Sequence, residues 1–172
     1  MDRSDKAVEL LKHLDAALEE NEQLVMCGGM AIMLAFGGKR QTFDVDVIAP
    51  VPMSEHLRKK VKEVADELGV DPHWLNDAAK GYASYLPEGW EKRLVPVELG
   101  FKKLKLYSLG RPDLIMLKLQ AGRAKDISDV REMKMTEDEA AIVLSNLERI
   151  AKFDNRAALT IRLLMEEWGF VR

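Results

Sequence analysis

Hydrophobic positions along the chain form helical and strand-like patterns that follow one another in a definite order. Apolar residues three and four positions apart predict helices, at 5–20, 54–68, 112–131, 136–150 and 156–168. Short apolar or alternating runs predict strands, at 24–27, 42–48, 94–99 and 104–109. The apolar run 30–36 stands between two glycine pairs and predicts a buried helix, whereas 70–89 lacks a period and predicts an irregular loop with short helical pieces.

This order of elements predicts an α+β fold, with a small mixed β-sheet flanked by helices and further helices at the C-terminal end. The predicted strands all lie before residue 110, and the elements after it are helical. We therefore expect a core over residues 1–131, the first helix included, and a helical extension over 132–172 that packs on this core. Thr136 and Glu139 form a capping-box pattern at the start of one of the last helices.

The composition is that of an ordinary globular protein. Of the 172 residues, 47% are hydrophobic and 32% are charged, a balance that argues against extensive disorder. The net charge of −3 gives no global attraction to nucleic acid or to anionic membranes.

Two further features concern the compartment. The longest weakly polar stretch, 24–38, is interrupted by four glycines and is shorter than the roughly 20 apolar residues of a membrane-spanning helix. The only cysteine, Cys27, cannot form an internal disulfide. We therefore expect a cytoplasmic protein that does not associate with membranes.

The predicted strand 42–48 carries candidate chemistry. Side chains alternate along a strand, so Asp44 and Asp46 share one face while Val45 and Val47 point into the core. Neighbouring carboxylates repel each other unless a cation lies between them, and such oxygen ligands suit Mg²⁺ that is also bound to phosphates. The alternative interpretation is a solvated strand face without a ligand.

Gly28 and Gly29 lie between a predicted strand and a predicted helix. At such a place, bare backbone amides and the positive end of the helix can approach a phosphate closely. A tight turn that only permits close packing explains the same pair equally well. The later pair at 37–38 does not form a P-loop, because Met33 replaces the required glycine and Arg40 replaces the Ser or Thr that binds Mg²⁺.

Together these motifs resemble a known family. The pattern Cys-Gly-Gly-Met-Ala, a short helix and then Arg-x-Thr-x-Asp-Val-Asp-Val, ending at residue 47, resembles the nucleotidyltransferase fold of the polymerase-β type. Farther along, Lys-Leu-Gln-Ala-Gly-Arg-Ala-Lys-Asp-Ile-Ser-Asp, over 118–129, resembles the AbiEii-like group of bacterial abortive-infection and toxin proteins. The combined resemblance covers residues 24–131.

The resemblance implies specific roles. Asp44 and Asp46 would bind the metal, Mg²⁺ or Mn²⁺, beside the triphosphate. The residues that would bind the nucleotide are Gly28, Gly29, Arg40, Thr42, Lys118, Lys125 and Asp126. Helical spacing places Lys118, Lys125 and Asp129 on one stripe, which a solvated helix face would also explain.

Active members of this type carry a third carboxylate on a neighbouring strand, and Glu98 is the candidate for it. Val95 and Val97 alternate away from Glu98, although Pro96 implies an edge or a bulge. Glu98 would then be catalytic and bind metal. Alternatively, it faces water.

A local excess of positive charge lies between Lys102 and Lys125, where the chain has seven Lys or Arg and a single acid, Asp113. This excess would guide RNA or triphosphate, or its first lysines would protect the exposed edge of a hairpin.

We predict an enzyme that uses two metal ions to transfer a nucleoside monophosphate from a nucleoside triphosphate to an RNA, protein or small-molecule acceptor. The resemblance favours the toxin of a toxin–antitoxin or phage-defence pair, whose partner is a separately encoded antitoxin. The main alternative is an antitoxin-like nucleotide- or protein-binding module that keeps the fold without turnover. A metal-dependent phosphodiesterase with the same acids is a third hypothesis.

Overall fold

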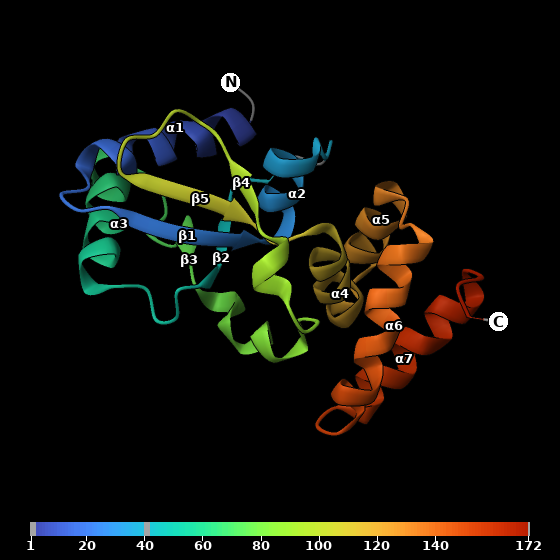
Figure 1. Ribbon diagram of the computed structural model, residues 1–172. Coiled ribbons are helices and arrows are strands. Elements are labelled where there is room, and N and C mark those ends of the chain that lie inside the picture. Colours follow the sequence, from blue (N-terminus) through green and yellow to red (C-terminus); the bar gives the residue numbers. More distant parts are fainter. Residues whose placement is uncertain (1–2, 40–41, 172) are drawn as a thin grey trace. The chain divides into compact units, whose positions relative to one another are not determined.

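The computed structural model describes residues 3–39 and 42–171 and divides the chain into two compact units (Figure 1). Unit 1 comprises residues 1–83 and 94–109, and unit 2 comprises residues 84–93 and 110–172. The sequence suggested a different boundary, after residue 131. The helix that follows residue 110 belongs with the C-terminal helices because it shares their hydrophobic core.

The described part of unit 1 contains a five-stranded mixed sheet. Its strands are β1 (Glu22–Cys27), β2 (Val45–Ala49), β3 (Leu75–Asn76), β4 (Val95–Val97) and β5 (Leu104–Ser108). They lie in the order β3-β2-β1-β5-β4. β1 pairs antiparallel with β2 and parallel with β5, while β3 runs parallel to β2 and β4 runs antiparallel to β5. The predicted strands are confirmed, but residues 42–44 lie outside β2, and the predicted loop 70–89 contains β3.

Unit 1 also has three described α-helices, α1 (Arg3–Ala17), α2 (Gly28–Phe36) and α3 (Glu55–Leu68). α3 begins where the hydroxyl of Ser54 accepts a hydrogen bond from the Leu57 N–H, and it ends at Gly69, whose φ is 63°. α1 and α3 pack against each other. Both bury leucines and valines in the core of unit 1, among them Leu10, Leu14, Leu57 and Val61.

Asp15, on α1, holds the loop that leads into β5. Its carboxylate accepts hydrogen bonds from the backbone N–H groups of Lys102, Lys103 and Leu104, at 2.7 to 3.1 Å. Burial alone would raise the pKa of the Asp15 carboxyl, but these N–H donors stabilise its charged form and lower the pKa below its ordinary value. The contact therefore anchors the β4–β5 connection on α1.

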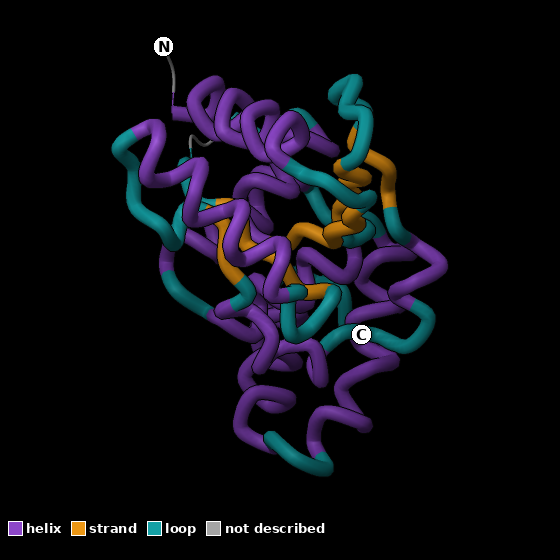
Figure 2. Tube along the Cα trace, turned by 90° about the vertical axis from the view of Figure 1, so that its left-hand side faces the viewer, coloured by secondary structure: helices purple, strands orange, loops and turns teal. Residues whose placement is uncertain are grey.

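Unit 2 consists mainly of helices, α4 (Arg111–Ala121), α5 (Ala124–Met133), α6 (Glu137–Ala151) and α7 (Asn155–Glu167). From Arg111 onward every regular element of the described chain is a helix (Figure 2). The four helices share one hydrophobic core, which includes Ile115, Val130, Leu147 and Ile161. The predicted capping box of Thr136 and Glu139 is confirmed at the start of α6.

The predicted single helix over 112–131 is wrong. The chain turns at Gly122, which has a φ of 63° and ends α4, and α5 begins at Ala124. A residue with a Cβ would pay about 1–2 kcal/mol for this left-handed conformation, so glycine is favoured there. The hydrophobic spacing continues through the turn, and for this reason the pattern does not show the break.

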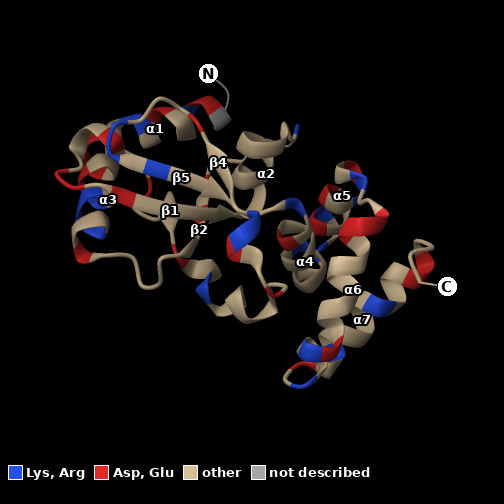
Figure 3. Ribbon diagram, viewed as in Figure 1, with Lys and Arg blue, Asp and Glu red and all other residues tan. Residues whose placement is uncertain are grey.

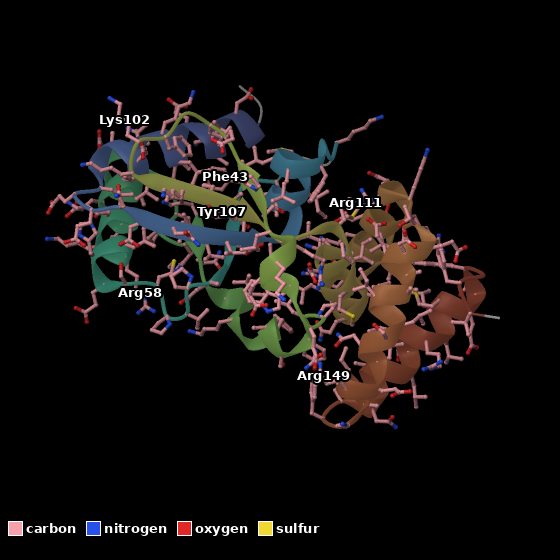
Figure 4. The ribbon with its side chains drawn as sticks, in the orientation of Figure 1. Phe43, Arg58, Lys102, Tyr107, Arg111 and Arg149 are labelled. Carbon is pink, nitrogen blue, oxygen red and sulfur yellow. The ribbon has the colours of Figure 1, made fainter. Side chains whose placement is uncertain are left out.

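Residues 84–93, the part of unit 2 that precedes β4 in the sequence, are held by side chains from the helices of unit 2. Arg149, on α6, donates hydrogen bonds of 2.8 Å to the backbone oxygens of Ser84 and Leu86 (Figure 4). At the end of the segment, Arg93 donates two hydrogen bonds, of 3.0 and 2.6 Å, to the buried carboxylate of Asp113 on α4. The segment is therefore part of unit 2 through polar contacts.

Candidate active site

Two glycines shape the turn between β1 and α2. Gly28 has a φ of 72°, in the left-handed region that glycine adopts without steric cost. A Cβ at Gly28 would lie 2.6 Å from Oδ2 of Asp46, closer than real Cβ atoms approach other atoms. Gly28 therefore permits both the turn and the close approach of the Asp46 carboxylate.

Thr42 borders the same turn. A Cβ at Gly29 would lie 3.3 Å from Cγ2 of Thr42, so a side chain at residue 29 would press on Thr42. α2 begins at this turn, and the first N–H groups of a helix point outward with the positive end of the helix dipole. The turn thus has the geometry of an anion-binding helix start.

The predicted pair of aspartates lies beside this turn. Asp44 is exposed and immediately precedes β2, while Asp46 lies within β2 and is partly buried. Strand alternation places both on one side, and Val45 and Val47 are fully buried on the other. Asp46 is paired with Cys27 in the β1–β2 ladder, directly before the glycines.

Asn76 is a further member of the site that the sequence did not reveal. It lies on β3, opposite Asp46 in the parallel β2–β3 ladder, and its Nδ2 donates a hydrogen bond of 3.4 Å to Oδ1 of Asp46. The only sequence signal for it is the short apolar stretch Trp74-Leu75 after a helix, which is too brief to show strand alternation.

The carboxylates of the site suit one kind of metal ion better than others. Among residues 3–39 and 42–171, no three His, Cys, Asp or Glu side chains lie close enough to hold a metal ion together. Mg²⁺, however, is commonly held by one or two carboxylates together with substrate phosphates and water. Asp44 and Asp46 beside the glycine turn fit an ion of this kind.

A comparison with known families decides the identity of the chain. The model of a family described as nucleotidyltransferase of unknown function (DUF6036) matches residues 5–161. The chain belongs to this nucleotidyltransferase family. Its α+β architecture, with a mixed five-stranded sheet flanked by helices, is consistent with a nucleotidyltransferase fold and confirms the predicted fold class. No curated protein and no solved structure matches the chain.

The expected position of Glu98 beside the two aspartates is wrong. β4 is separated from β2 by β1 and β5, so three strand spacings of about 4.8 Å place it about 14 Å from Asp46 across the sheet. Glu98 also follows Val97, which pairs with Leu106, and so it lies toward the opposite end of the sheet from Asp46. Its side chain is exposed. The sequence places Glu98 next to a predicted strand but does not reveal the order of the strands in the sheet. β4 is the edge strand at the opposite side of the sheet from β3.

Lys118 is buried within unit 2 and is not on a solvated face. Its ammonium donates hydrogen bonds to Asp126 at 2.9 Å and to Asp129 at 2.7 Å, and only 6% of the residue is exposed. Arg123 donates a further hydrogen bond of 2.6 Å to Asp126. α5 carries both basic and acidic residues, which are blue and red in Figure 3.

The protonation of this cluster follows from its contacts. Burial alone would raise the pKa of the Asp126 carboxyl, but the hydrogen bonds from Arg123 and Lys118 outweigh it and lower the pKa below its ordinary value. Two cations thus face two carboxylates, so the cluster can be neutral as a whole. A part for Lys118 and Asp126 in a nucleotide pocket stays a prediction.

The remaining predicted features are Lys125, Arg40 and the basic run from Lys102 to Lys125. Lys125 is exposed on α5, and Arg40 lies outside the described residues. The basic run is partly neutralised, since Arg111 pairs with Glu139 at 2.6 Å (Figure 4). Its lysines do not protect a sheet edge, because β5 lies between β1 and β4.

The helices of the described chain differ from membrane-spanning helices. None of those within residues 3–39 and 42–171 has the length and apolar character that crossing a bilayer requires.

Proposed function

We propose that this chain binds a nucleoside triphosphate with Mg²⁺ or Mn²⁺ and transfers its nucleoside monophosphate to an acceptor. The observation that carries the proposal is the close approach of the Asp46 carboxylate to Gly28 at the start of α2, where a side chain in place of the glycine would leave it no room. It combines a carboxylate ligand for a cation with a helix start suited to phosphate, within one site.

In the proposed reaction, a bond forms between an acceptor oxygen and the α-phosphorus, and the bond from the α-phosphorus to the bridging oxygen breaks. Pyrophosphate leaves, and the acceptor proton passes to solvent. The bound cation supplies Lewis-acid stabilisation of the phosphate charge. The amides at Gly28 and Gly29 orient the triphosphate, and Asp44 with Asp46 fixes the cation.

The acceptor and the biological setting extend this proposal. An RNA, a protein or a small molecule is the acceptor class, and the setting is a cytoplasmic toxin of a toxin–antitoxin or phage-defence pair. The resemblance of residues 118–129 to AbiEii-like proteins supports this setting, and a separately encoded antitoxin would be the partner.

The experiment measures nucleotide binding and pyrophosphate release by the full chain. Each of the four α-labelled triphosphates is supplied with MgCl₂, with and without cellular RNA or protein as acceptor. We expect Mg²⁺-dependent binding and label transfer, both lost in the double variant Asp44→Asn, Asp46→Asn. The matched control, Asp66→Asn with Glu67→Gln, removes two exposed carboxylates of α3 and should behave as the unaltered protein. Unchanged binding in the Asp44/Asp46 variant would contradict the proposed site.

A second candidate is a nucleotide-binding module without turnover. It is favoured by one observation: among the described residues, no group of three His, Cys, Asp or Glu side chains could hold a metal ion. Triphosphate binding without pyrophosphate release, in the presence of every acceptor tested, would select this candidate.

A further inference from the structure

The orientation of the Asn76 amide is fixed by two backbone groups next to it in sequence. Its Oδ1 accepts a hydrogen bond of 3.0 Å from the N–H of Ala78, and its Nδ2 donates one of 3.2 Å to the carbonyl oxygen of His73. Rotating the amide by 180° would place two donors together and two acceptors together, so both bonds would be lost. The amino group of Asn76, and not its oxygen, therefore faces Asp46.

The two oxygens of Asp46 are consequently placed by different elements. Oδ1 faces the Nδ2 of Asn76 on β3, at 3.4 Å, whereas Oδ2 lies 2.6 Å from the position that a Cβ of residue 28 would take at the start of α2. A carboxylate held in this way has one orientation relative to the glycine turn. An amide N–H cannot ligate a cation, so the neighbouring strand contributes a donor where a further carboxylate would bind metal.

We infer that Asn76 is a positioning residue for Asp46 and that it limits the site to one divalent cation, held by Asp44, Asp46 and phosphate oxygens. This inference rests on the proposed function. Sites with two cations about 3.5–4 Å apart need carboxylates that reach both ions. Here the position across from Asp46 on β3 is neutral.

Asn76→Asp would place an additional carboxylate beside Asp46. The new carboxylate oxygen would replace Nδ2, within about 3.4 Å of the Asp46 carboxylate and close to the His73 carbonyl oxygen. Without a cation these oxygens repel one another, and a cation between them removes the repulsion. The variant should therefore have a lower Tm than the unaltered chain without metal, and a larger rise in Tm when metal is added.

The experiment uses the full chain and MnCl₂ as the probe, with bound Mn²⁺ counted by electron paramagnetic resonance in the presence of α,β-methylene-ATP. We expect one Mn²⁺ for each chain and two in Asn76→Asp. Asn76→Ala removes the positioning contact but adds no ligand, so it should keep one site with an affinity for Mn²⁺ at least fivefold weaker. The control Asn21→Asp adds a carboxylate at an exposed position and should still bind one.

The possible failures are distinguishable. Two Mn²⁺ ions in the unaltered chain would overturn the limit to one ion and leave the proposed function standing. No bound Mn²⁺ in the unaltered chain would overturn the proposed function together with this inference. A single ion in Asn76→Asp, with unaltered affinity in Asn76→Ala, would overturn the role of Asn76 alone.

Discussion

Gly28 serves two purposes that substitution can separate. Gly28→Ala introduces a methyl group at a φ of 72° and within 2.6 Å of the Asp46 carboxylate. We expect a loss of about 1–2 kcal/mol in the free energy of unfolding from the backbone alone. Displacement of Asp46 should also weaken Mg²⁺-dependent triphosphate binding at least tenfold, as measured by calorimetric titration.

Gly37 provides the matched control. It has a similar φ of 69°, but nothing lies within 4 Å of a Cβ added there. Gly37→Ala should therefore lose a similar amount of stability while its triphosphate affinity stays unaltered. Equal affinities in the two variants would show that Asp46 does not need the space at Gly28.

Among the individual site residues, those that belong to a local motif could be predicted from the sequence. The glycine pair and the two aspartates are close in sequence, and strand alternation is sufficient to place Asp44 and Asp46 together. Asn76 was not predicted because its strand has two residues and shows no pattern. Glu98 was misplaced because its contacts depend on the order of strands across the sheet, which no local pattern encodes.

Among the elements, the corner between α4 and α5 depends on Lys118. Lys118→Ala would leave Asp126 and Asp129 buried beside each other with one cation fewer. Removing one partner of a buried ion pair typically costs about 3–5 kcal/mol, so we expect a loss of about 3 kcal/mol in urea-induced unfolding.

Lys125→Ala is the control for this prediction, because Lys125 is exposed on the same helix as the two acids. Its effect on the free energy of unfolding should stay within about 0.5 kcal/mol. If both variants are equally stable and only Lys118→Ala loses triphosphate affinity, then Lys118 has the nucleotide-binding role that the sequence suggested.

Two carboxyls, on α1 and α5, give the stability of the protein a dependence on pH. The carboxyls of Asp15 and Asp126 both have a pKa below the ordinary value of 3.8 in the folded chain. A carboxyl of this kind stabilises the fold fully above its unfolded-state pKa, and this stabilisation is lost as the pH falls toward the folded-state pKa. The free energy of unfolding should therefore decrease as the pH is lowered below about 4.

Asp15→Asn and Asp126→Asn should each reduce the slope of this decrease, when chemical unfolding is followed at a series of pH values. Asp66→Asn removes an exposed carboxylate and should leave the slope unchanged. A slope that none of the three variants alters would assign the acid sensitivity to other groups.

The elements themselves were predicted well where hydrophobic period and end signals agree. α3, between Ser54 and Gly69, and α6, with its capping box, have the predicted ends to within one residue. The long helix was divided in the structure because Gly122 turns the chain without interrupting the apolar spacing. The left-handed conformation of Gly122 ends α4 at that position, and the spacing of apolar residues does not report it.

For the whole molecule, the chain passes between units 1 and 2 at residues 83/84, 93/94 and 109/110. Arg149 fixes the short excursion by binding two of its backbone carbonyls. Arg149→Ala should therefore increase hydrogen–deuterium exchange and proteolytic cleavage within 84–93, since the segment loses these anchors. Arg162→Ala, which alters an exposed arginine on α7, should leave both unchanged. Equal protection of 84–93 in the two variants would contradict this role.

The excursion through 84–93 also determines an order of events on the ribosome. All five strands of the sheet precede residue 110, so the nascent chain can close the sheet of unit 1 once these residues have left the exit tunnel of the ribosome. The loop 84–93 cannot form its hydrogen bonds to α6 at that stage, because α6 is translated later. Unit 2 therefore closes after unit 1, and a nascent chain whose five strands have left the exit tunnel while α6 is still inside it would present a closed sheet with this loop still accessible to proteases and chaperones.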